Sequence, residues 1–60
     1  MKIAKFCAEL SAKGCVIFRH GSRHDVWFSP ITGNTFAIPR HGSRELSKGL
    51  EIQARKTLGV

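Results

Sequence analysis

Three β-rich segments joined by short turns constrain this fold more than any other feature of the sequence. The segments span residues 15–20, 23–29 and 34–38 and are rich in β-branched and aromatic side chains. A Gly-Ser pair at 21–22 separates the first two, and a Pro-Ile-Thr-Gly turn at 30–33 separates the last two. Connections this short join antiparallel neighbours, because a parallel crossover needs about a dozen residues or more. The sequence therefore predicts a three-stranded antiparallel meander.

An amphipathic segment precedes the first strand. Its apolar residues recur at helical spacing over residues 2–13, while lysines and Glu9 lie largely off that stripe. Gly14 follows, where a left-handed C-terminal cap favours a residue without Cβ. The apolar positions are Ile3, Phe6, Cys7 and Leu10. This pattern predicts a first helix.

A second amphipathic segment follows the last strand. Leu50, Ala54 and Leu58 recur at helical spacing, Ser47 precedes them as an N-cap residue, and Gly59 follows as a stop. Ile52 lies off this stripe, and we expect it to face solvent. The resulting order is α-β-β-β-α, an α+β fold in which two helices pack on one face of a three-stranded antiparallel sheet.

The 60 residues provide for one domain, 1–60, and their 42% hydrophobic content is enough for a single core. Ten Lys and Arg against four Asp and Glu give a formal net charge of +6, which favours a polyanionic partner and nucleic acid above others. No segment has the length and apolar character that a membrane span or a secretion signal requires. We therefore expect a cytoplasmic protein that binds no membrane.

The cysteines and aromatic residues receive structural roles. Cys7 and Cys15 are expected to be reduced thiols, since a lone pair in a basic chain without a signal segment is a weak disulfide candidate. His20 and His24 have the separation of half a zinc site, but no close cysteine pair completes it, so we expect neither a metal nor another cofactor. Most of the aromatic residues are assigned to the core, and Trp27 is the one suspected of an exposed or partner-facing role.

The string Arg-His-Gly-Ser-Arg occurs at residues 19–23 and again at 40–44. In an antiparallel meander the end of the third strand lies beside the start of the second, so both copies are expected at one end of the sheet. Gly-Ser loops expose backbone amides and a hydroxyl, and arginine offers a planar fork that matches phosphate oxygens. Ordinary turn chemistry explains either copy alone, whereas two converging copies favour binding of a nucleic-acid backbone.

His24 is the candidate catalytic residue. A neutral imidazole can take the proton of a ribose 2′-hydroxyl, which then attacks the adjacent phosphate, and this route needs no metal ion. Neighbouring arginines would stabilise the charge that develops on the phosphate. A second group must protonate the leaving oxygen, and the sequence leaves both His20 and His41 open for that role.

Taken together, these motifs resemble the HicA toxins of type II toxin-antitoxin systems over nearly the whole chain. Each motif alone is weak, but their order and spacing in so short a chain are fairly specific. The residues that carry the resemblance are Gly14, Arg19, the Gly21-Ser22-Arg23-His24 turn, the Pro39-Arg40-His41 string, Glu45-Leu46-Ser47-Lys48-Gly49 and Gly59.

The resemblance implies a fold like the double-stranded-RNA-binding domain, ribosome-independent cleavage of messenger RNA, and neutralisation by a HicB-type antitoxin. It also implies that His24 is the active histidine. Many members carry this histidine directly after Gly-Ser, whereas Arg23 intervenes here, and a shift of one residue exchanges strand faces unless the turn is one residue longer. The residues assigned to RNA binding are Arg19, Gly21, Ser22, Arg23, Arg40, His41, Arg44 and Lys48.

Two other functions use the same basic surface. One is a non-catalytic module that grips double-stranded RNA by its shape and its phosphates. The other is one half of a regulatory complex in which an acidic partner covers the basic face.

Overall fold

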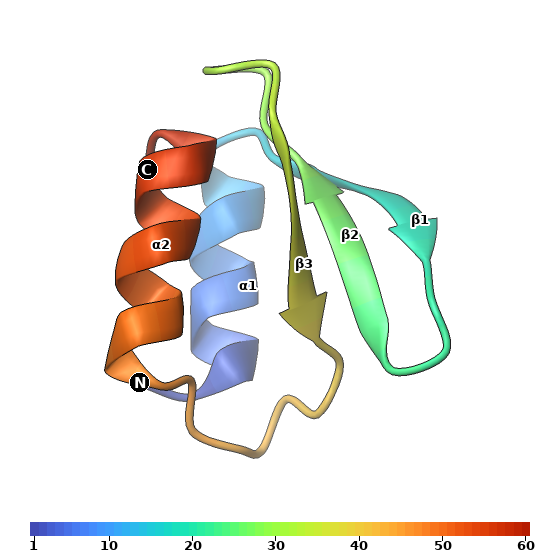
Figure 1. The fold of residues 1–60 in the computed structure, drawn as a ribbon, viewed down its shortest axis with the longest axis vertical. Helices are drawn as coiled ribbons and strands as arrows, with labels where there is room; N and C mark the ends of the chain where they lie inside the picture. Colours follow the sequence, from blue (N-terminus) through green and yellow to red (C-terminus); the bar gives the residue numbers. More distant parts are fainter.

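The computed structural model describes residues 1–60 and confirms the α+β fold with the order α-β-β-β-α (Figure 1). Both helices lie on one side of the sheet, and each element ends within two residues of its predicted bounds. No helix is long and apolar enough to cross a membrane. The elements are α1 (Ile3–Ala12), β1 (Val16–His20), β2 (His24–Phe28), β3 (Thr35–Pro39) and α2 (Lys48–Leu58).

The sheet is the predicted antiparallel meander, with β2 between β1 and β3. β2 and β3 pair without interruption from His24 opposite Pro39 to Phe28 opposite Thr35. The pairing of β1 with β2 is irregular, because the register shifts at Phe18. Such a bulge bends its strand and leaves one residue outside the ladder, and the Phe18 side chain is exposed.

The core lies between the helices and one face of the sheet. Its fully buried apolar side chains come from α1, β3 and α2, and they form one cluster with Trp27 of β2. Strand residues alternate between faces, so the opposite face of the sheet, which includes Val16, remains uncovered. The fully buried apolar residues are Phe6, Leu10, Ile38, Ala54 and Leu58.

Two expectations about aromatic residues were wrong. Trp27 was suspected of an exposed role, but it is only 6% exposed because its face of β2 is the one that the helices cover. Phe18 belongs to the group of aromatic residues expected mostly in the core, but it is 68% exposed because it occupies the bulge of an edge strand. Ile52 is exposed, as expected.

The predicted helix boundaries are confirmed by their capping contacts. The Ser47 hydroxyl accepts a hydrogen bond from the Leu50 amide at 3.3 Å and satisfies one free donor of the first turn of α2. Gly59 ends α2 with a φ of 72°, and Gly14 follows α1 with a φ of 90°. Both glycines adopt the left-handed conformation that a Cβ disfavours.

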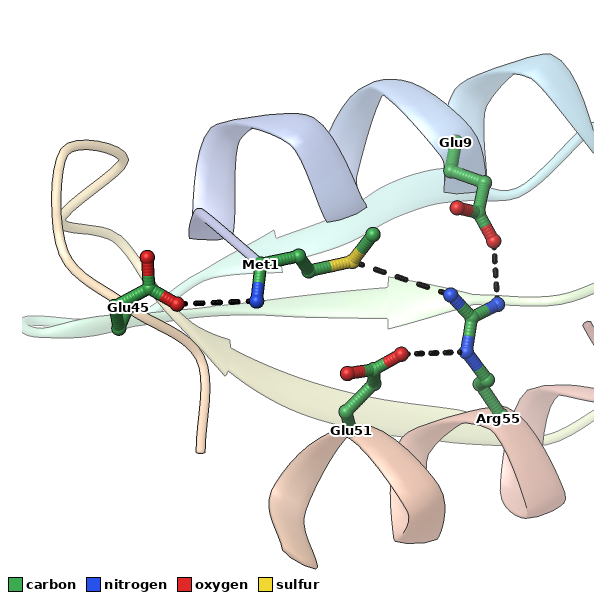
Figure 2. A network of polar contacts seen from close by, with 5 residues as sticks. All are labelled: Met1, Glu9, Glu45, Glu51 and Arg55. Atoms are coloured by element: carbon green, nitrogen blue, oxygen red, sulfur yellow. Dashed lines mark hydrogen bonds and ion pairs between the residues drawn. The ribbon is translucent and has the colours of Figure 1, made fainter. Parts of the chain in front are cut away.

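The two helices are joined by the Arg55 guanidinium, shown in Figure 2. It donates to the Glu51 carboxylate of its own helix at 3.0 Å and to the Glu9 carboxylate of α1. It also lies 5.1 Å from the centre of the Phe6 ring, within the range of a cation–π contact. The hydrogen bond from Arg55 lowers the pKa of Glu9, so this carboxylate is ionised at neutral pH. An ion pair therefore joins α1 and α2 in addition to their apolar contact.

Ser29 provides a buried polar link between the sheet and α2. Its side chain is fully buried, and its hydroxyl donates to the Leu58 carbonyl at 2.6 Å while it accepts from the Ile31 amide at 3.2 Å. The Leu58 carbonyl belongs to the last turn of α2, where carbonyls lack helical partners. One hydroxyl therefore satisfies two backbone groups.

Ser29→Ala should lower the free energy of unfolding by about 1–3 kcal/mol, because it leaves buried backbone groups without partners. Urea denaturation followed by circular dichroism measures the change. Ser11→Ala, at an exposed position of α1, is the matched control and should change stability little. Equal stability of the two variants would contradict the assigned role of Ser29.

Candidate nucleic-acid interface

The two Arg-His-Gly-Ser-Arg segments meet at one end of the sheet, as the sequence predicted. The Arg40 amide donates to the Arg23 carbonyl at 3.1 Å. The Arg40 guanidinium donates to the Gly21 carbonyl in the turn between β1 and β2. That turn is closed by the Gly21 amide, which donates to the His24 carbonyl at 2.7 Å. The first and second copies of the string are therefore in direct contact.

A cavity of about 660 Å³ opens where the two segments meet. No hydrophobic side chain lines it. Three guanidinium groups around one opening create a positive potential, and arginine is the side chain best suited to bidentate contact with phosphate oxygens. The site can therefore hold an anionic backbone. Its lining residues are Ser22, Arg23, Arg40, His41 and Arg44.

The loop that carries Arg40 to Arg44 is fixed against the start of α1. The Ile3 amide donates to the Arg44 carbonyl at 2.9 Å, and the Ala4 amide donates to the Gly42 carbonyl at 3.0 Å. A Cβ on Gly42 would lie 3.1 Å from the Ala4 Cβ, closer than ordinary packing. The loop thus satisfies free amides of the first turn of α1, and these bonds fix the backbone that carries Arg40 to Arg44.

Asp25 is the carboxylate that orders this end of the sheet. Its Oδ1 atom accepts from His20 Nδ1 at 2.8 Å and from Arg40 Nε at 3.1 Å. These hydrogen bonds lower the pKa of Asp25, with the larger effect from His20 and the smaller from Arg40. The carboxylate is therefore ionised at neutral pH. Asp25 therefore fixes the direction of the Arg40 side chain at the wall of the cavity.

The cavity gathers only some of the residues that the sequence assigned to the site. His24 is exposed and begins β2, but it does not line the cavity. Alternation along β2 places His24 on the face opposite to Asp25, and Arg19 pairs with Val26 on that same open face. Gly21 contributes its carbonyl, and Lys48 is exposed at the start of α2 outside the lining.

The intervening Arg23 explains this separation. The turn ends at Arg23, whose side chain lines the cavity, and the next residue, His24, enters the strand on the open face. An extra residue after Gly-Ser was expected to exchange the strand faces unless the turn is one residue longer. The structure shows arginine at the cavity and histidine beyond it.

Sequence reasoning missed the link from Asp25 to His20 and Arg40. The signal was present in the meander, because a tight turn at 21–23 places His20 directly opposite Asp25 on the same face. The bond to Arg40 could not be read from the sequence, since it depends on the path of the chain after β3. Asp25 was therefore assigned no role from the sequence.

No group of three or more His, Cys, Asp or Glu side chains is arranged to hold a metal ion. Cys15 is buried, Cys7 is half-buried, and both are free thiols. The site therefore offers guanidinium, imidazole, hydroxyl and carboxylate groups.

Comparison with known proteins gives one match. The family described as the HicA toxin of bacterial toxin-antitoxin matches residues 3–60, which cover both helices and the entire sheet. No curated protein and no solved structure matches the chain.

Arg44→Ala should weaken binding to an RNA hairpin, because its side chain lines the cavity and makes no hydrogen bond within the protein. Loss of one phosphate contact lowers the slope of log affinity against log salt by about 0.7–0.9. Fluorescence anisotropy over a salt series measures both quantities. Lys56→Ala removes one positive charge from the last turn of α2 and is the control; an equal effect there would argue against a localised site.

Proposed function

Because the chain belongs to the HicA toxin family of bacterial toxin-antitoxin systems, we propose that it acts as an endoribonuclease on messenger RNA. The proposed toxin domain spans residues 1–60 and cuts RNA in the cytoplasm without a ribosome or a metal ion. The observation that carries the proposal is the cavity in which Arg23, Arg40 and Arg44 surround one opening. Such a site suits the phosphodiester that an RNA-cleaving protein must hold.

The proposed reaction begins with a phosphodiester bound by the cavity. The His24 imidazole takes the proton of the adjacent 2′-hydroxyl, and the 2′-oxygen attacks the phosphorus. Guanidinium groups stabilise the negative charge that grows on the phosphate oxygens. Exposure of His24 beside Arg23, at the end of the hairpin, supports this role.

The bound RNA is proposed to extend beyond the cavity on both sides. Arg19 lies on the open face with His24 and would contact the phosphate that follows the hairpin. Lys48, exposed at the start of α2, would contact a phosphate on the other side of the cavity. The formal charge of +6 supports such an extended electrostatic contact.

The proposed partner that controls this activity is a HicB-type antitoxin. A protein that neutralises the toxin by covering the cavity must place acidic side chains against Arg23, Arg40 and Arg44, because buried charges need partners. Membership of a toxin-antitoxin family supports an antitoxin partner. We propose that carboxylates of the antitoxin occupy the positions of RNA phosphates.

A second candidate function is a non-catalytic RNA-binding module. It is favoured by one observation, the placement of Arg23 at the cavity and of His24 outside it. In this alternative, the arginines bind phosphate and His24 does not reach a 2′-hydroxyl.

Purified protein incubated with RNA in EDTA distinguishes the two functions. The enzyme should cleave RNA under these conditions, and His24→Ala should lower the cleavage rate by about 100-fold or more, the usual range for loss of general base catalysis. RNA affinity of this variant should be unchanged. Intact RNA with the wild-type protein would support the binding module, and cleavage that requires added metal would contradict the proposed mechanism.

Induced expression of the chain in bacteria should arrest growth, and co-expression of the neighbouring gene's product should restore it. His24→Ala, expressed at the same level, should leave growth unaffected because it binds RNA without cutting it. Colony counts and growth curves measure the outcome. Arrest by the His24→Ala variant as strong as that by the wild type would assign toxicity to RNA binding alone.

A further inference from the structure

His20 and Asp25 form an imidazole–carboxylate pair outside the residues that line the cavity. They lie directly opposite each other on β1 and β2, with Nδ1 of His20 2.8 Å from Oδ1 of Asp25. The carboxylate is held in its ionised form and can only accept hydrogen bonds. Nδ1 of His20 must therefore carry the proton in this contact.

This contact fixes the role of the second ring nitrogen of His20. The His20 side chain is 71% exposed, whereas that of Asp25 is 15% exposed. The imidazole ring therefore extends into solvent while the carboxylate that holds it is largely buried. In the imidazolium form, Nδ1–H donates to Asp25 and Nε2–H is left for another acceptor. After Nε2 gives up its proton, the neutral ring keeps the same hydrogen bond to Asp25. Imidazoles held in this way by a carboxylate are typical of proton-transfer sites.

The pair is joined to the cavity through Arg40. The same Oδ1 atom of Asp25 contacts the His20 ring and, at 2.9 Å, Nη2 of Arg40. Arg40 also donates to the Gly21 carbonyl, one residue after His20. A phosphate held by Arg40 would therefore be bound to a guanidinium that shares its Asp25 contact with the His20 ring.

The two faces of the hairpin present different imidazoles. His20 lies on the face of Asp25, and His24 lies on the opposite face, with Ser22 and Arg23 of the cavity in the turn between them. In an in-line displacement the attacking and leaving oxygens lie on opposite sides of the phosphorus. A phosphodiester at the end of the hairpin would then meet a base on one side and an acid on the other.

We propose that His20 is the general acid of RNA cleavage and that Asp25 is its positioning residue. This inference rests on the proposed endoribonuclease function, in which His24 is the base. As the 2′-oxygen bonds to phosphorus and its proton passes to His24, the bond from phosphorus to the 5′-oxygen breaks. Nε2 of His20 gives its proton to that oxygen. The products are a 2′,3′-cyclic phosphate and a 5′-hydroxyl, and no other reactant is consumed.

The alternative acid is His41, which lines the cavity. Its ring has no hydrogen-bond partner in the structure, and nothing selects which of its nitrogens faces a ligand. His20 differs because Asp25 holds its tautomer and direction. We assign His41 to phosphate binding.

A pair of RNA substrates tests the assignment. The cleavage site of the wild-type protein is first mapped, and the 5′-oxygen at that bond is then replaced by sulfur. A thiolate departs without being protonated. The sulfur substrate therefore needs no general acid but still needs a general base. His20→Gln should cut the oxygen substrate about 100-fold or more slowly than the wild type and the sulfur substrate at nearly the wild-type rate.

Matched variants complete the test. His24→Ala should be slow on both substrates, and His41→Gln should keep the wild-type ratio of the two rates. Asp25→Asn should weaken RNA binding through Arg40 equally for both substrates, and saturating RNA removes this effect from the cleavage rate. The loss of His20 positioning remains, so the cleavage rate at saturating RNA should fall more for the oxygen substrate. Circular dichroism checks that each variant is folded.

Three results would overturn the assignment of His20 and leave the proposed endoribonuclease function valid. These are a wild-type rate of His20→Gln on the oxygen substrate, equal slowing of that variant on both substrates, and selective rescue of His41→Gln by sulfur. Failure of the wild-type protein to cut any RNA would instead refute the proposed function, and the assignment of His20 with it.

Discussion

Burial of both helices against a single face of three short strands is the constraint on which the rest of the molecule depends. Phe6, Leu10, Ile38 and Leu58 have no exposed surface, and they come from α1, β3 and α2. A core this small tolerates little loss of packing. The polar contacts of Arg55 and of the buried Ser29 fix how α2 meets α1 and the sheet. With these elements fixed, the loops at one end of the sheet have defined positions.

Electrostatic repulsion opposes the arrangement that these loops form. Arg23, Arg40 and Arg44 surround one opening, and like charges at short range disfavour the folded state. Asp25 offsets part of this repulsion, since its ionised carboxylate contacts Arg40 and His20. A single carboxylate leaves the cavity strongly positive. An anionic backbone or an acidic protein bound at the cavity would relieve the remaining repulsion.

The sequence was sufficient for the fold because its signals were local. Turn residues at 21–22 and 30–33 dictated the meander, and Ser47, Gly14 and Gly59 marked the helix ends. The convergence of the two arginine-rich strings followed from topology alone. Trp27 and Phe18 were misassigned because β2 is apolar on both faces and because a bulge leaves no signature in the sequence. The separation of His24 from the cavity depends on where the turn ends, and the sequence is compatible with two turn lengths.

The irregular pairing at Phe18 has a consequence for how the protein behaves at high concentration. β1 is an edge strand with exposed Val16, Ile17 and Phe18, a combination that invites growth of the sheet from one molecule to the next. The bulge breaks the even spacing of backbone donors and acceptors along that edge. The bulge therefore hinders the alignment of a second strand along the whole of β1, which counters the tendency of the exposed apolar side chains to extend the sheet.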